Sequence, residues 1–136
     1  MQMRYLGIDF GSKRIGLAVS DEAGNFAFPL SVLQNSEDAA EQILRICREK
    51  NIGTIVVGDS ENFQMKKNDI MKEVALFVEK LKGISGLPVL LHPEFLTSQE
   101  AERLQGKNDM LDASAAAIIL KSFLEIKNNN KNHDNL

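Results

Sequence analysis

The chain has 136 residues, about the length of one domain, and it is 43% hydrophobic and 26% charged, which is typical of a globular protein rather than a disordered or fibrous one. Its 16 basic and 19 acidic residues give a formal charge of −3, which excludes a wholesale basic surface for nucleic acid, so any such binding must use a local patch. No apolar run approaches the ~20 residues that cross a bilayer, and the N-terminus lacks a signal-peptide pattern. We therefore expect a cytoplasmic protein with no membrane partner.

The first half of the chain predicts three short strands. They occupy residues 4–9, 14–20 and 27–33, each rich in apolar or β-branched residues and separated from the next by turn residues. Pro29 interrupts the third run, and because proline cannot donate a backbone hydrogen bond, this strand suits the edge of a sheet. Short connections favour an antiparallel meander.

The second half alternates helices with strands. The apolar spacing predicts a helix over 35–50, capped by Asn35 or Ser36. The remaining elements are a strand at 54–58, an amphipathic helix ending near Gly83, a strand at 88–91, a helix starting at the capping-box spacing of 97–100, and a last helix over about 109–127. The order β-β-β-α-β-α-β-α-α requires crossover connections, a partly parallel sheet and helices on both of its faces, which is an α/β fold.

The C-terminal tail differs in composition from the rest of the chain. The tail at 128–136 is nearly all polar and is expected to be disordered, which leaves residues 1–127 as a single domain.

Cys47 is the chain's one cysteine, so a disulfide framework within the chain is impossible, and a reducing compartment suits it. Its apolar neighbours predict a buried thiol.

Three carboxylates stand at the ends of predicted elements. Asp9 closes the first strand, Glu94 follows the last strand, and Asp112 lies in the first turn of the last helix. Asp109 precedes Asp112 by three residues, on nearly the same face. If the first strand is central, these acids meet at one edge of the sheet, where a divalent cation would relieve their repulsion. Oxygen-only ligands of this kind suit Mg²⁺ or Mn²⁺.

Each acid also has a structural explanation. Asp9 could initiate a tight turn, Asp109 could cap the last helix, and Asp112 would suit the positive end of its dipole. Lys13 and Arg14 follow Asp9 closely and could neutralise phosphates. The case for a phosphodiester-cleaving site therefore depends on all these residues together, since a divalent cation can activate water and stabilise the charge growing on the phosphate.

Several segments, taken in order, carry a resemblance to a known family. They read MRYLGIDFGSKRIGLAVSD at 3–21, IVVG at 55–58, PV at 88–89, EFLTS at 94–98, AE at 101–102 and DASAA at 112–116. Together they closely resemble the YqgF-type (RuvX-like) proteins, bacterial Holliday-junction-resolvase-like nucleases that are implicated in maturing the precursor of small-subunit ribosomal RNA. The resemblance covers nearly all of the chain except the tail, and its opening segment is the most specific part.

The resemblance implies a ribonuclease-H-like fold with a mixed five-stranded sheet of order 3-2-1-4-5, strand 2 being antiparallel. It also implies a Mg²⁺-dependent nuclease (Mn²⁺ being the alternative ion) with one or two ions, acting on RNA or on branched DNA as a monomer or homodimer. The family's catalytic and metal-binding acids fall on Asp9, Glu94 and Asp112, with Asp109 as an accessory ligand. The expected contacts to nucleic acid are Lys13, Arg14 and Lys107.

The chain departs from the family pattern around its proposed substrate contacts. The stretch at 59–65 is acidic and lacks the usual glycines, and Phe95 stands where the family typically has arginine. A catalytically weakened adaptor that binds nucleic acid without cutting it therefore remains an alternative. A further alternative is an ATP-binding domain, because residues 7–12 also resemble the first phosphate loop of the actin and sugar-kinase superfamily. Those proteins bind nucleotide between two such domains, and this chain supplies one.

Overall fold

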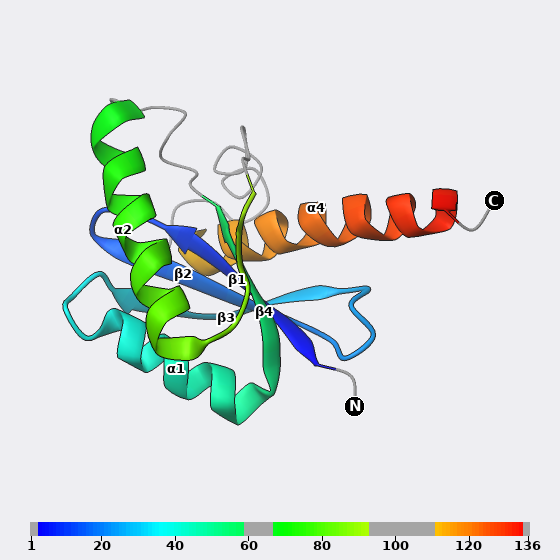
Figure 1. The fold of residues 1–136 in the computed structure, drawn as a ribbon, viewed down its shortest axis with the longest axis horizontal. Helices are drawn as coiled ribbons and strands as arrows, with labels where there is room; N and C mark the ends of the chain where they lie inside the picture. Colours follow the sequence, from blue (N-terminus) through cyan, green and yellow to red (C-terminus); the bar gives the residue numbers. More distant parts are fainter. Residues whose placement is uncertain (1–2, 59–66, 93–110, 135–136) are drawn as a thin grey trace.

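A computed structural model describes residues 3–58, 67–92 and 111–134 (Figure 1). The elements along the chain are β1 (Arg4–Phe10), β2 (Arg14–Ser20), β3 (Ala27–Gln34), α1 (Ala39–Lys50), β4 (Ile52–Gly58), α2 (Lys67–Ser85), β5 (Val89–Leu91) and α4 (Leu111–Asp134). The predicted strands are all present, within two residues of their expected limits. The helix predicted to begin at 97–100 lies outside the described residues.

The five strands form one mixed sheet in the order β3-β2-β1-β4-β5. β2 pairs with both β1 and β3 in antiparallel fashion, whereas β4 pairs in parallel with β1 and β5. The predicted order and directions are confirmed. Pro29 lies on the edge strand β3, and the register shifts between Leu17 and Ala18, the residue opposite this proline. The edge position accommodates a residue that has no N–H to donate.

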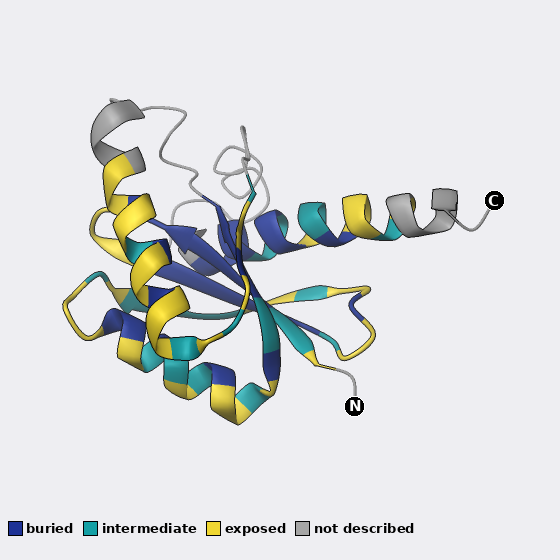
Figure 2. Cartoon of the chain, viewed as in Figure 1, coloured by how far each residue is buried: buried dark blue, intermediate teal, exposed yellow. Residues whose placement is uncertain are grey.

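Helices cover both faces of the sheet, as Figures 1 and 2 show. The α1–α2 face buries Leu6, Ile8 and Phe10 of β1 in the larger core cluster. The α4 face holds a smaller cluster against which Tyr5 packs. Because successive side chains of a strand point to opposite faces, Gly7 and Asp9 belong to the same face as Tyr5. The central strand is therefore buried on both sides, and Asp9 is directed to the side of α4.

The start of α1 differs from the prediction. The helix begins at Ala39, and Asp38 at its N-cap makes no side-chain capping bond to the helix. The Ser36 hydroxyl instead donates to the Asp38 carboxylate at 2.5 Å. Asn35 is directed toward the β1–β2 turn, where its amide donates to the Gly11 carbonyl oxygen. Both predicted caps were wrong because a long-range turn contact and a local side-chain pair compete for the same polar groups.

The predicted end of the last helix is also wrong. α4 continues to Asp134, seven residues beyond Lys127. The Lys127 Nζ lies 5.2 Å from the Tyr5 ring centroid, and Asn128 Nδ2 donates to the Gly24 carbonyl oxygen at 3.2 Å. These contacts hold the helix where the polar sequence begins, and extending an existing helix is far easier than nucleating one.

No helix among the described residues is long and apolar enough to span a membrane.

Cys47 is buried at 4% exposure, as its apolar neighbours predicted. Burial raises the pKa of its thiol from the ordinary 9.0 to about 11. The unfolded chain therefore loses this proton at a lower pH than the folded chain does, and it binds fewer protons between these two values. We expect the free energy of unfolding to fall as pH rises through this window. Urea unfolding at a series of pH values will measure the fall, and a Cys47→Ala variant, which lacks the thiol, should show less of it.

Gly83 offers a position where the chain can be stabilised. It lies near the end of α2, and a Cβ added there would meet nothing within 4 Å. We expect Gly83→Ala to raise the free energy of unfolding by about 0.5–1 kcal/mol, because glycine loses more backbone freedom in a helix than alanine does. The matched control is Gly86→Ala just past the helix, where φ is +68° and alanine is expected to destabilise. Urea titration of both variants will test the opposite signs.

Candidate active site

Asp9 lies near the carboxyl end of the central strand and is 4% exposed. Across the sheet its partners are two glycines, Gly16 on β2 and Gly58 on β4. Because glycine has no side chain, neither strand neighbour of Asp9 stands between its carboxylate and the helix that packs on this face of the sheet. Of the predicted acids, Asp9 is the one whose side chain falls within the described residues.

α4 packs along β1, and its N-terminal part lies toward the end of the strand that carries Asp9. The Tyr5 and Phe123 ring centroids are 5.8 Å apart, and a Cβ on Gly7 would lie 2.7 Å from Leu120 Cβ and 3.0 Å from the Ala116 carbonyl oxygen. A step along β1 toward its carboxyl end therefore corresponds to a step along α4 toward its N-terminus. The further step from Gly7 to Asp9 is about 6.6 Å of strand, or roughly four residues of helix. That step leads toward the first turn of α4, which begins at Leu111.

The other predicted acids are placed only in part. The backbone of Asp112 belongs to this first turn of α4, one helical turn before Ala116, but its side chain lies outside the described residues. Glu94 and Asp109 lie in the segment 93–110, which is also outside them. Among the side chains that the structure describes, no group of three His, Cys, Asp or Glu residues could hold a metal. The meeting of all four acids therefore stays a prediction.

His92 brings the end of β5 to the same edge of the sheet. Its backbone N–H donates to the Val57 carbonyl oxygen at 2.9 Å, which extends the β4–β5 ladder and sets His92 beside Gly58, in the row of Asp9. On the α4 side, His92 Nε2 lies 3.2 Å from Ser122 Oγ, and the ring meets Phe123 edge-on with centroids 6.0 Å apart. The described chain therefore leaves β5 at the end of the sheet that carries Asp9, and Glu94 follows His92 by two residues in the sequence.

Sequence reasoning did not identify His92 as part of this edge. Its position directly after a predicted strand and two residues before Glu94 was the available signal. The pairing with α4 could not be read from the sequence, because Ser122 is 30 residues away along the chain.

Lys13 and Arg14 are exposed at the turn between β1 and β2, just beyond Asp9. The Gly11 N–H closes this turn by donating to the Arg14 carbonyl oxygen at 3.0 Å. The turn therefore presents two basic residues at the end of the sheet where β1 terminates. Lys107, the third expected contact to nucleic acid, lies outside the described residues.

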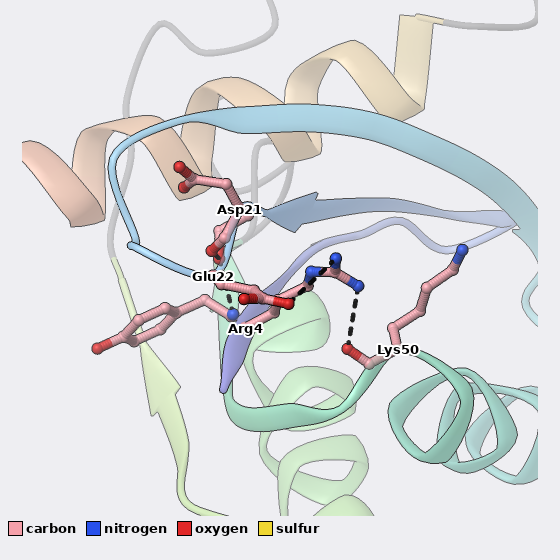
Figure 3. Close-up of polar contacts among 6 residues, drawn as sticks. Arg4, Asp21, Glu22 and Lys50 are labelled. Atoms are coloured by element: carbon pink, nitrogen blue, oxygen red, sulfur yellow. Dashed lines mark hydrogen bonds and ion pairs between the residues drawn. The ribbon is translucent and has the colours of Figure 1, made fainter. Parts of the chain in front are cut away.

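The polar groups at the opposite end of the sheet have structural roles. Arg4 lies 3.9 Å from the Glu22 carboxylate and donates to the Lys50 carbonyl oxygen at 3.5 Å (Figure 3). The Asp21 carboxylate accepts the N–H groups of Asn25 and Phe26, at 2.8 and 3.1 Å. The bond from Phe26 is the main cause that holds the pKa of Asp21 below its ordinary 3.8. These contacts stabilise the β2–β3 turn. They account for the polar groups at this end of the sheet, so the candidate site is the end that carries Asp9.

Comparison with known proteins identifies the family. The family model described as "RuvX: Holliday junction resolvase" matches residues 3–126. A protein from Thermoanaerobacter pseudethanolicus named "Putative pre-16S rRNA nuclease" is 33% identical, with 93% of this chain and 99% of that protein covered. A protein of the same name from an Anaeromyxobacter species is 38% identical, with 90% and 97% covered.

Solved structures share the fold at low sequence identity. Thermus thermophilus RuvC, in complex with a Holliday junction substrate, has a TM-score of 0.60 at 18% identity and covers 92% of this chain and 96% of its own. The fowlpox virus Holliday junction resolvase has a TM-score of 0.53 at 14% identity, with 90% and 99% covered. These likenesses, with the observed strand order, confirm the predicted ribonuclease-H-like fold. Since the family match and the alignments to relatives extend over nine-tenths of the sequence, this chain belongs to the RuvX family.

Proposed function

We propose that this chain is a metal-dependent nuclease that hydrolyses phosphodiester bonds during maturation of the small-subunit ribosomal RNA precursor. The observation that carries the proposal is the burial of Asp9 near the end of the central strand, on the face of the sheet that α4 covers. Membership of the RuvX family and the name shared by the curated relatives support the activity and the substrate. A cytoplasmic location, expected from the sequence, is part of this proposal.

The donor set fits a hard divalent cation. Asp9, Glu94 and Asp112, with Asp109 as an accessory ligand, offer carboxylate oxygens, which suit Mg²⁺ or Mn²⁺ in one or two sites. When bound, such an ion lowers the pKa of water and stabilises negative charge on the phosphate and on the leaving oxygen. Asp9 is held rigidly by the sheet on both sides, so the protein fixes at least this ligand before the substrate arrives.

The basic residues hold the substrate. Lys13 and Arg14 stand exposed just beyond Asp9, and Lys107 precedes the last helix in the sequence. Contacts from these side chains would place a phosphate of the nucleic acid at the end of β1 and neutralise part of its charge. Because such contacts carry no base information, the shape of the substrate and its remaining contacts must supply any selectivity.

The proposal is tested by incubating the protein with end-labelled precursor RNA, single-stranded DNA and a four-way DNA junction, each with Mg²⁺, Mn²⁺ or EDTA. We expect cleavage of the RNA that requires the metal. Cleavage of the junction alone would favour a resolvase, and binding without products under any metal would establish the adaptor. Size-exclusion chromatography of the same protein will distinguish a monomer from a homodimer, the two states that the resemblance allows.

A further inference from the structure

Asn35 fastens the turn that carries Lys13 and Arg14 from the neighbouring edge strand. Its side-chain Nδ2 donates to the Gly11 carbonyl oxygen at 2.8 Å, and its backbone N–H donates to the Lys13 carbonyl oxygen at 2.9 Å. Asn35 directly follows β3, whose last residue Gln34 pairs with Arg14. One residue therefore ties both ends of the β1–β2 turn to the third strand.

The β1–β2 turn lies at the surface of the molecule. Ser12, Lys13 and Arg14 are exposed, while Asn35 is half-buried beneath them. The α2 side of the turn opens on a hollow of about 340 Å³, which is lined by Phe10, Ser12, Asn35, Glu73, Leu76 and Phe77. The hydrogen bonds from Asn35 to the Gly11 and Lys13 carbonyl oxygens restrain this turn from the side of β3.

We propose that Asn35 is a positioning residue for the nucleic-acid backbone, acting through Lys13 and Arg14. This inference rests on the proposed function, because it assigns these two cations to substrate phosphates. A fixed turn presents its basic side chains from a defined backbone, so binding loses less conformational entropy than it would from a mobile loop. Asn35 itself does not need to touch the substrate.

The proposal predicts a specific loss in Asn35→Ala. This variant loses the side-chain bond to Gly11 and keeps the backbone bond to Lys13, so the turn is loosened and the strand pairing stays. We expect the Kd for a fluorescein-labelled single-stranded RNA, measured by anisotropy in EDTA, to rise about fivefold. In cleavage assays KM should rise by a similar factor while kcat stays within about twofold, because the loss precedes the chemical step.

The chain supplies a matched control for this substitution. Asn128 Nδ2 donates to the Gly24 carbonyl oxygen at 3.2 Å, which is the same kind of bond to a different turn. Asn128→Ala should leave the Kd for RNA unchanged. In addition, amide hydrogen exchange at Gly11, whose N–H closes the β1–β2 turn, should be faster in Asn35→Ala than in Asn128→Ala.

A double-mutant comparison separates positioning from general destabilisation. If Asn35 acts through the two cations, Asn35→Ala should have no further effect on Kd once Lys13→Ala and Arg14→Ala are present. An unchanged Kd in Asn35→Ala, or an equal increase in both backgrounds, would overturn the positioning role while leaving the nuclease proposal intact. A wild-type protein that neither binds nor cuts RNA would overturn both.

Discussion

Asp9→Asn is expected to reduce metal-dependent cleavage by about 10³-fold or more, which corresponds to at least ~4 kcal/mol of activation free energy. Asparagine has nearly the shape of aspartate but lacks its negative charge, so it should fill the same space on β1 and hold a divalent cation poorly. The melting temperature should change by no more than a few degrees, because the strand pairing to Gly16 and Gly58 does not involve the side chain. Product formation from labelled RNA at saturating Mg²⁺ measures the effect.

The same substitution at Asp21 provides the control. Asp21 is a carboxylate at the opposite end of the sheet whose Oδ1 accepts two backbone N–H groups, and asparagine keeps that oxygen. Asp21→Asn should therefore retain full cleavage. Calorimetric titration with Mn²⁺ gives a second readout, since Asp9→Asn alone should weaken metal binding. If Asp9→Asn cleaves as well as the wild type, Asp9 has no role in the reaction.

The sheet could be predicted because its signals are local. The alternation in β1 places apolar residues on one face and Tyr5, Gly7 and Asp9 on the other, and the proline of β3 predicts an edge strand. The start of α1 could not be predicted in the same way. Asn35 has the properties of a helix cap, but a turn 24 residues earlier in the chain offers its amide a carbonyl oxygen. Local propensity is weak compared with such a tertiary bond.

In the candidate site, too, local patterns predict some residues, whereas others depend on long-range contacts. The sequence placed Asp9 at the end of the first strand, and in the structure β1 ends one residue later, at Phe10, with Asp9 buried. The roles of His92 and Gly58 depend on strand register and on where α4 crosses the sheet, which are long-range properties. Local patterns carry no information on which residue lies opposite which, so these two positions became apparent only in the folded chain.

The close approach of α4 to the sheet predicts a large loss of stability in Gly58→Ala. A Cβ at Gly58 would lie 2.6 Å from Ile119 Cδ1 and 2.8 Å from Cγ2, and Ile119 is fully buried. We expect the free energy of unfolding, measured by urea titration, to fall by about 2–3 kcal/mol, because a full core must shift to admit the methyl group. Cleavage should fall as well, since Gly58 on β4 is the strand partner of Asp9 and Ile119 packs on the same face of the sheet as Asp9.

A compensating change at Ile119 tests whether this contact is the cause. Ile119→Ala removes all three atoms that crowd the new methyl group. Alone it should destabilise by about 2–4 kcal/mol through the cavity that it leaves. In the double variant, the methyl group added at position 58 partly fills that cavity. The loss of unfolding free energy caused by Gly58→Ala should therefore be smaller by at least about 1 kcal/mol in the Ile119→Ala background than in the wild type. Gly83→Ala, which adds the same methyl group where nothing is near, controls for the backbone effect. Additive costs at Gly58 and Ile119 would show that α4 does not press on the sheet at this point.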